Sequence, residues 1–457
     1  MSGRTSIRVP SSSTRRTRWL DCARKGTLSS CTVSQRIPAH PRLRLRIRRC
    51  TSVSIASKRM SRFVKFCPRS SRGVIPSSSS FSPLCPPMSE GPANVIQLPT
   101  RRPVIHVYRS EIFMNTTSTQ LGATAPIAVS AAHVDSVGPL TVAYSPDFLV
   151  WMLGSGDGSH PTNPVRAQLA TEFLVSELAG ATSVLDPTSL DRATVRAAIE
   201  SVHEHGFVSR VVDDGLDAQW SGRRPEMGQT AMTMFAGTMV AVENMLAGTS
   251  KVAFNPQGAK HHAAFDGSSG FCVFNDMVWA ALEFKKAGLR PLYLDWDIHA
   301  GDGTQTMLFE TDIPTLSIHN GATFPYDGMT RELSLAGTRH VSHHLENHAF
   351  NWCIEDEDGD DALAWALGEA MEVIDEYQPD VILLAAGADG MGGANNLGVD
   401  NTYTYAGFTA AAHSVAEVAN RWANGRVLIG GAGGYQPLTH TPRVWANVVE
   451  EIYLGVN

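Results

Sequence analysis

Short apolar runs alternate with amphipathic segments along the chain from about residue 140 onward. The apolar runs predict strands at 140–145, 251–255, 291–297, 314–319, 380–389 and 425–434. Apolar residues at three- and four-residue spacing predict helices at 163–178, 228–248, 274–288 and 360–377. Continuous apolar strands that alternate with helices are typical of a mostly parallel sheet covered on both faces. The pattern therefore predicts an α/β fold, with a single three-layer domain over residues 140–457.

Residues 1–113 have no such periodicity and are rich in Arg, Ser and Pro. Up to Ile112 the chain carries 22 Lys and Arg against 3 Asp and Glu, whereas the remainder carries 16 against 41, a net charge of −25. A segment of this composition cannot bury enough apolar surface to fold alone, so we expect a disordered basic leader. Such a leader resembles an organelle transit peptide or a nucleic-acid-binding arm. It is equally explained by an upstream-extended reading frame in which Met88 or Met114 is the working start.

The distribution of cysteines indicates the cellular compartment. Five of the seven lie in the leader, and the body keeps only Cys272 and Cys353. Two cysteines are too few for a disulfide framework, which favours a reducing, cytoplasmic setting. No apolar stretch reaches the length of a membrane span. Nothing in the body favours recognition of nucleic-acid bases or phosphates. We expect neither a membrane nor a nucleic-acid partner for the body, and the oligomeric state stays open.

Polar residues gather where the predicted strands end. The segment "YLDWDIHAGDGTQ" (293–305) places four acidic or imidazole side chains directly after an apolar run. Charged groups at the end of a buried strand are costly to desolvate unless something binds them. Core packing does not explain this set of residues: His261, His262, Asp295, Asp297, His299, Asp302, Asp389 and Tyr435.

Three of these residues have the chemistry of a metal site. Asp297, His299 and Asp389 offer two carboxylates and one imidazole, and three protein ligands with an open position are typical of catalytic zinc. The same donors would also accept Fe²⁺, Co²⁺ or Mn²⁺. The acids that remain, Asp295 and Asp302, can each accept a hydrogen bond from one histidine of the 261–262 pair, which would fix its tautomer.

The order H-H, D-x-D-x-H-x-G-D-G, G-A-D and G-G-x-G-G-Y resembles the histone deacetylase family, including bacterial acetoin-utilisation and acetylpolyamine deacetylases of the arginase–deacetylase fold. The resemblance runs from "AYSPDFL" (143–149) to "RVWANVVEEI" (443–452). It implies zinc-dependent hydrolysis of an N-acetyl amide in acetyl-lysine or in a small amine such as an acetylpolyamine. By the same resemblance, His262 is the general base, His261 its electrostatic neighbour and Tyr435 the residue that polarises the carbonyl.

The resemblance also assigns residues around the reacting groups. Gly270, Phe271 and Phe324 match the walls of an acyl-lysine tunnel, and Arg166 of "HPTNPVR" matches an arginine that borders an internal cavity. The family further implies a structural K⁺ site formed around Asp295, Asp297, His299 and Ser317.

The sequence departs from the family pattern at a few positions. Ala300 replaces a second histidine, Lys260 precedes the histidine pair, and "GADGMGGANNLG" lacks a second acid. Two alternatives stay open: a binuclear manganese ureohydrolase of the same fold, and a non-catalytic acyl-lysine binder. The first needs more carboxylates around a second metal, and Met391 stands where one is expected. The acidic body also favours cationic substrates through electrostatic steering.

Overall fold

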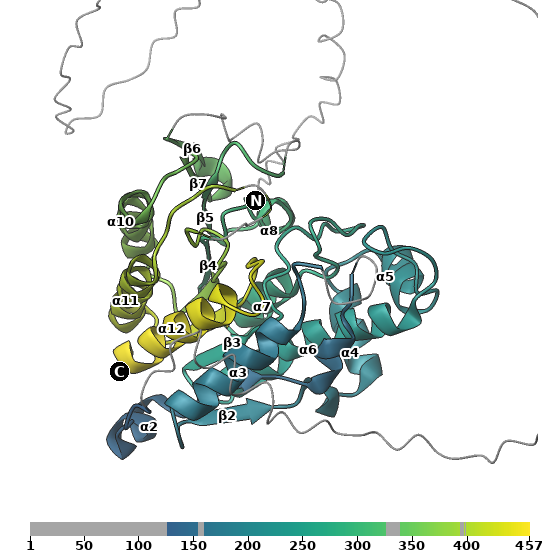
Figure 1. The fold of residues 1–457 in the computed structure, drawn as a ribbon, viewed down its shortest axis with the longest axis horizontal. Coiled ribbons are helices and arrows are strands. Elements are labelled where there is room, and N and C mark those ends of the chain that lie inside the picture. The colour runs from purple at the N-terminus through teal and green to yellow at the C-terminus, as the bar shows by residue number, and fades with distance from the viewer. Residues whose placement is uncertain (1–125, 154–159, 326–338, 394–396, 398) are drawn as a thin grey trace, which may run out of the picture. The chain divides into compact units, whose positions relative to one another are not determined.

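A mostly parallel, nine-stranded sheet runs through the part of the chain that the structure describes (Figure 1). The computed structural model describes residues 126–457 apart from 154–159, 326–338, 394–396 and 398, so the leader predicted over residues 1–113 lies outside the described residues. In spatial order the strands are β2-β1-β3-β9-β8-β4-β5-β7-β6, and β6 runs antiparallel to β7. Their bounds are β1 Leu140–Ala143, β2 Thr182–Leu185, β3 Val252–Asn255, β4 Pro291–Asp295, β5 Thr315–Asn320, β6 His340–His344, β7 Ala349–Ile354, β8 Val381–Ala385 and β9 Val427–Gly430.

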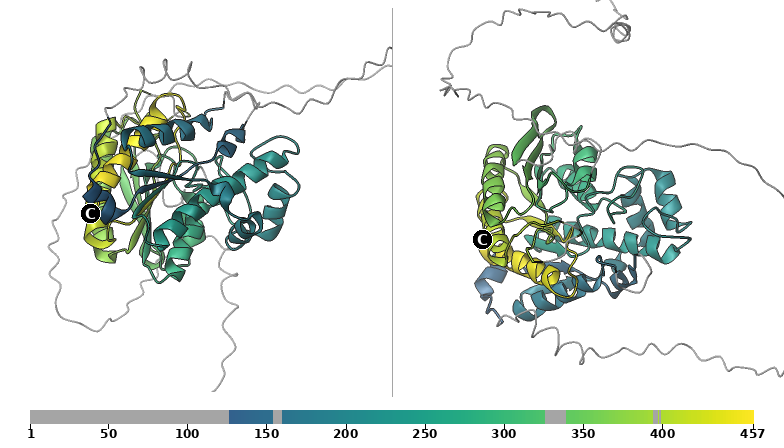
Figure 2. Two further views of the ribbon diagram at one scale, coloured as in Figure 1. Left: turned by 90° about the horizontal axis from the view of Figure 1, so that it is seen from below. Right: turned by 45° about the horizontal axis from the view of Figure 1, so that its top comes forward.

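Helices cover both faces of this sheet, as the sequence pattern predicts. In Figures 1 and 2, α10 to α12 lie on one side of the sheet and α4 to α7 on the other. None of the helices in the described part of the chain is long and apolar enough to cross a membrane. The helices are α2 Ala131–Val137, α3 Val165–Glu177, α4 Arg192–Glu200, α5 His205–Val212, α6 Pro225–Leu246, α7 Asp276–Lys286, α8 Asp302–Leu308, α10 Asp360–Tyr377, α11 Tyr405–Trp422 and α12 His440–Gly455, with short 3₁₀ turns η1 Pro146–Val150, η2 Pro187–Ser189 and η3 Leu345–Asn347.

The central strands build two hydrophobic cores because their side chains alternate between the faces. Along β4, Leu292 and Leu294 join the core formed with α3, α10, α11 and α12. Tyr293, between them, joins the core formed with α4 to α7. Every residue of β4 is buried, which explains why the strand reads as a continuous apolar run instead of an alternating one. The expected three-layer α/β architecture is confirmed.

Local signals set several helix boundaries. Asn275 caps α7 by accepting a hydrogen bond from the backbone N–H of Val278, and Thr404 caps α11 by accepting one from Gly407. Helix α6 begins with Pro225, a residue favoured in the first turn because that position needs no N–H donor. Helices α6 and α7 begin within three residues of the sequence prediction, whereas α11 was not predicted.

The structure also corrects the predicted elements. Strands β2, β6 and β7 were not predicted. Strands β2 and β6 lie at the edges of the sheet and are partly exposed, so they lack the apolar run of a buried strand, as in "HVSHH" of β6. Four predicted strands end earlier than expected: residues 144–145, 296–297, 386–389 and 431–434 lie outside the strands. Helix α2 lies before the predicted start at residue 140 and is tied to α12, since His133 Nε2 lies 2.8 Å from the Tyr453 carbonyl oxygen.

The sheet order explains why the polar strand ends meet. Strands β3, β9, β8 and β4 are consecutive neighbours and run parallel. The loops that follow them carry, in that order, the histidine pair, Tyr435, Asp389 and the acidic segment 295–302. Because the carboxyl ends of parallel strands lie at one edge of a sheet, all of these side chains reach a common region.

Candidate metal-dependent active site

Asp297, His299 and Asp389 form a compact cluster of possible metal ligands. One ligand atom from each residue lies within 4.8 Å of the other two, and no other cluster of this kind occurs among the described residues. His299 Nδ1 lies 2.8 Å from Asp389 Oδ2 and 3.3 Å from Asp297 Oδ1. All three side chains are buried. Two buried carboxylates and one imidazole carry a surplus of negative charge that a divalent cation would neutralise, so the residues fit the expected metal.

Backbone groups hold the two carboxylates in place. The N–H of Ile298 donates to Asp389 Oδ1 over 3.1 Å, and the N–H of Gly433 donates to Asp297 Oδ2 over 2.5 Å. A Cβ atom at residue 433 would lie 2.4 Å from an oxygen of each carboxylate. Glycine is therefore required there, because only a residue without a side chain lets the β9 loop approach both ligands.

The ionisation of the cluster follows from its crowding. Burial and the nearby Asp297 carboxylate raise the pKa of Asp389 to about 6. Burial opposes ionisation of Asp297 too, but His261 and His299 hold its pKa below the usual range. Without a cation, the two carboxylates thus depend on neighbouring imidazoles for charge balance.

The adjacent histidines each contact a separate aspartate, as the sequence predicts. His261 Nδ1 lies 2.8 Å from Asp295 Oδ2, and His262 Nδ1 lies 2.7 Å from Asp302 Oδ1. The Tyr293 hydroxyl, which the sequence analysis did not single out, also donates to Asp295 Oδ2, over 2.7 Å. Each Nδ1 is thus engaged, and each Nε2 is left for the interior of the site.

The two imidazoles differ in their preferred charge. Burial opposes protonation of His261, but Asp295 and Asp297 outweigh it and raise its pKa to about 9. Burial and the neighbouring His261 lower the pKa of His262 to about 4. At neutral pH His262 is therefore the uncharged imidazole of the pair and can accept a proton.

Tyr435 lies beside His299 of the cluster. Its ring centroid is 5.9 Å from that of His299, and the side chain is 8% exposed. Burial, with Asp389 and Asp297 nearby, raises the pKa of its hydroxyl well above the ordinary value. Among the described residues no hydrogen bond uses this hydroxyl, so it remains a protonated donor beside the cluster.

The predicted tunnel residues lie beside His262 and Tyr435. The Phe324 ring packs edge-on against His262 with centroids 4.9 Å apart, and the Phe271 ring lies 6.3 Å from that of Tyr435. Gly270 has a φ of 49°, and a Cβ at this position would lie 2.3 Å from His262 Cδ2. Phe324 and Gly270 thus lie against the imidazole, and Phe271 lies beside Tyr435.

The remaining predicted positions are distributed as follows. Ser317 lies on β5 directly beside Asp295 of β4 and hydrogen-bonds His319, so the residues proposed for K⁺ are neighbours. Ala300 is buried behind the cluster. Met391 is 8% exposed and packs in the hydrophobic core of the α10–α12 side. Part of the loop that follows Asp389 lies outside the described residues.

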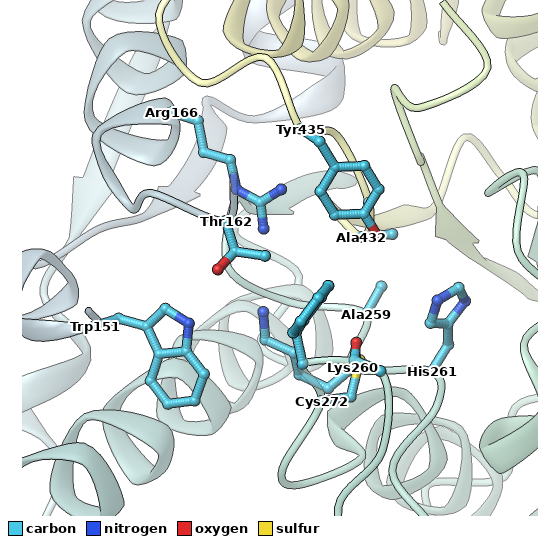
Figure 3. A pocket seen from close by; sticks show the side chains of 12 residues that line it. Trp151, Thr162, Arg166, Ala259, Lys260, His261, Cys272, Ala432 and Tyr435 are labelled. Atoms are coloured by element: carbon cyan, nitrogen blue, oxygen red, sulfur yellow. The ribbon is translucent and has the colours of Figure 1, made fainter. Parts of the chain in front are cut away.

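A small cavity adjoins the cluster, and sequence reasoning identified only part of its lining. Water-sized molecules have about 20 Å³ of space in it. Arg166 borders it as expected, whereas Trp151, Thr162 and Cys272 were not singled out for this role. Figure 3 shows this lining. Lys260 also faces this cavity, which the residue type alone could not indicate.

Comparison with known proteins places this arrangement in a family. The histone deacetylase domain family matches residues 160–452, more than half of the chain. The acetoin utilization protein AcuC of Staphylococcus aureus (strain MRSA252) is 25% identical over 318 residues, covering 63% of this chain and 76% of that protein. AcuC of Bacillus subtilis (strain 168) is 31% identical over 228 residues, covering 49% of this chain and 56% of that protein.

Two further relatives extend the comparison. The probable histone deacetylase 1-A of Xenopus laevis is 32% identical over 196 residues, which cover 42% of this chain and 38% of that protein. The crystal structure of the HDA15 HD domain shares the fold with a TM-score of 0.57 at 19% identity, covering 69% of this chain and 88% of that one. With the family match over residues 160–452, the chain belongs to the histone deacetylase family.

Proposed function

We propose that the protein hydrolyses N-acyl amides, releasing a carboxylate and a free amine, with one divalent metal ion held by Asp297, His299 and Asp389. The observation that carries the proposal is that a neutral imidazole, His262, and a protonated phenol, Tyr435, both lie next to the three-ligand cluster, with ring centroids 6.3 Å and 5.9 Å from that of His299. A bound Zn²⁺, Fe²⁺ or Co²⁺ would polarise the amide carbonyl and acidify a water molecule.

The side chains around the cluster then have distinct tasks. His262 accepts a proton at Nε2 from the attacking water while its Nδ1 stays hydrogen-bonded to Asp302, and it later returns a proton to the amine as the C–N bond breaks. The Tyr435 hydroxyl donates a hydrogen bond to the carbonyl oxygen as negative charge builds on it. His261, held by Asp295, stays cationic and keeps the adjacent His262 neutral.

The aromatic walls and the relatives support an acylated amine as the substrate class. Phe271 and Phe324 flank the site with apolar surface, which suits the methylene chain of an acylated lysine or polyamine. The relative named as a probable histone deacetylase favours acetyl-lysine, and the apolar walls also suit smaller acetylated amines. The acidic body would assist cationic members of either class at low salt.

The ureohydrolase alternative is less well supported. It needs a second metal and further carboxylates, but Met391 packs in the hydrophobic core where a ligand would be required. A non-catalytic acyl-lysine binder would be expected to lack Tyr435 or a histidine, and this chain keeps all three.

The test combines metal analysis with a substrate screen. Chelation should abolish hydrolysis of acetyl-lysine peptides or acetylpolyamines, and Zn²⁺ or Co²⁺ should restore it at about one metal per chain. Asp389→Asn should lose the metal, whereas Asp312→Asn, a change of equal charge at an exposed residue, should keep it. Two tightly bound Mn²⁺ ions with hydrolysis of arginine or agmatine would contradict the proposal.

A further inference from the structure

The cavity beside the metal cluster contains two cationic side chains. Arg166 and Lys260 both line it, together with Tyr435 and Gly433 of the catalytic centre. In Figure 3 the side chains of Arg166, Lys260 and Tyr435 are directed toward the same space. Tyr435 and Gly433, which would lie near a reacting carbonyl, therefore share one cavity with the positive charges of Arg166 and Lys260.

Arg166 is only partly satisfied within the protein. The side chain is 3% exposed, its guanidinium donates to the Gly434 carbonyl, and it stacks on Trp445 at 5.0 Å from the ring centroid. Its Nε, however, is buried without a hydrogen-bond partner among the described residues. A buried guanidinium N–H without an acceptor carries a desolvation cost that an anionic ligand would remove.

Lys260 adds a second donor without an acceptor. Its backbone N–H donates to Asp276, but no hydrogen bond or ion pair of its ammonium group occurs among the described residues. The buried Asp276 carboxyl is already bonded to two backbone N–H groups and to the Thr238 hydroxyl. The ammonium group is thus free to bind an anion in the cavity.

The position of the cavity indicates which part of a substrate would reach it. Phe324 packs against the catalytic imidazole, where the amine side of the amide would enter, whereas Tyr435 and Gly433 line the cavity together with Phe271. An acyl group longer than acetyl would therefore extend from the carbonyl into the cavity. Because Arg166 and Lys260 meet it there, a polar, negatively charged acyl end is favoured over an apolar one.

We propose that Lys260, with Arg166, is a specificity-determining residue that favours short acyl groups ending in a carboxylate, such as succinyl. This inference rests on the proposed amide hydrolysis. Burial, and the charge of Arg166, lower the pKa of Lys260 to about 8, so the amine is protonated at neutral pH and gains a partner when a carboxylate binds. The anion would bind by charge-assisted hydrogen bonds from both cations.

The kinetic test compares two acyl groups of the same shape. The acyl chain of N-succinyl-lysine ends in a carboxylate, whereas that of N-isocaproyl-lysine ends in an uncharged isopropyl group of similar shape. Lys260→Met should lower the succinyl-to-isocaproyl ratio of kcat/KM by roughly tenfold or more, and Lys260→Arg should retain most of that ratio. Lys286→Met changes the net charge equally at an exposed site and should leave the ratio unchanged. An unchanged ratio in Lys260→Met would overturn the proposal.

A binding measurement separates this inference from the catalytic one. Succinamate carries the amide and the carboxylate without an amine, and isocaproamide is its uncharged counterpart. Calorimetry on the full chain should show tighter binding of succinamate in the wild type than in Lys260→Met, with isocaproamide binding alike in both. Succinamate binding that is indifferent to Lys260 would refute the anion site. Lys260-dependent binding in a protein that hydrolyses no amide would refute the proposed function alone.

Discussion

The two adjacent histidines of the site occupy contrasting surroundings. His261 contacts Asp295, which is 0% exposed and also accepts the Tyr293 hydroxyl, and its other nitrogen lies 3.9 Å from Asp297. His262 packs against Phe324 and contacts Asp302, whose side chain is 25% exposed. One imidazole is surrounded by buried carboxylates, and the other is surrounded by apolar walls and one partly solvated acid.

This difference teaches that neighbours decide the charge of a histidine more than its sequence context does. Both rings are buried, and burial alone disfavours the charged form of each. Buried carboxylates reverse that effect for His261 and raise its pKa to about 9, whereas the partly exposed Asp302 does not reverse it for His262. The cation on His261 then helps to keep His262 neutral, so the pair combines a fixed charge with a proton acceptor.

Replacing each histidine should break the comparison with the largest effect. We expect His262→Ala to lower kcat/KM by about 10²- to 10⁴-fold with metal content unchanged, because the proton acceptor is lost. His261→Ala should lower kcat/KM by a factor at least ten times smaller, since the role of His261 is electrostatic. Steady-state kinetics with metal analysis would check this. The exposed His205→Ala serves as control, and equal losses in the two variants would contradict the division of roles.

Removing the Tyr435 hydroxyl should separate carbonyl polarisation from proton transfer. Tyr435→Phe should lower kcat by roughly 10²-fold or more, as for other donors to a developing oxyanion. Neither histidine contacts this hydroxyl, so the pH at which kcat/KM falls on the acid side should stay the same. A pH profile measured alongside turnover tests both points. Normal turnover would remove Tyr435 from the mechanism, and a shifted profile would show coupling to the histidines.

The smallest expected effect is a pair of opposite pH shifts. Asp302 raises the pKa of His262, so Asp302→Asn should lower that pKa. The acid limb of kcat/KM should then move to lower pH, because His262 stays neutral down to a lower pH. Asp295 raises the pKa of His261, so Asp295→Asn should discharge His261, raise the pKa of His262 and move the limb to higher pH.

The measurement is the acid limb of the kcat/KM profile, with thermal unfolding as a check that both variants remain folded. Shifts in opposite directions, each of about one pH unit or less, would support the electrostatic relation between the two imidazoles. Shifts in the same direction would show that His261 does not control the charge of His262.

Much of this site could be predicted from residue types and spacing. Charged residues directly after buried strands have few structural explanations, so Asp297, His299 and Asp389 can be predicted as metal ligands from the sequence, and the structure brings the three side chains together. The carboxylate partners of the histidine pair, Asp295 and Asp302, can likewise be predicted, since they are the two acids of segment 293–305 that are not needed as metal ligands. The edge strands β2 and β6 were missed because partly exposed, polar strands lack the apolar run that identifies buried ones.

The α/β class, the buried strands and the polar residues at their carboxyl ends can all be predicted from the chain alone, because periodicity and desolvation cost act locally. The position of β9 between β3 and β8, which brings Tyr435 to the cluster of candidate metal ligands, becomes apparent only in the folded protein. The same holds for Lys260, which faces the internal cavity beside Arg166. The direction of a side chain and the charge of a buried group depend on contacts between segments that are distant in the chain. Residue spacing carries no information about those contacts.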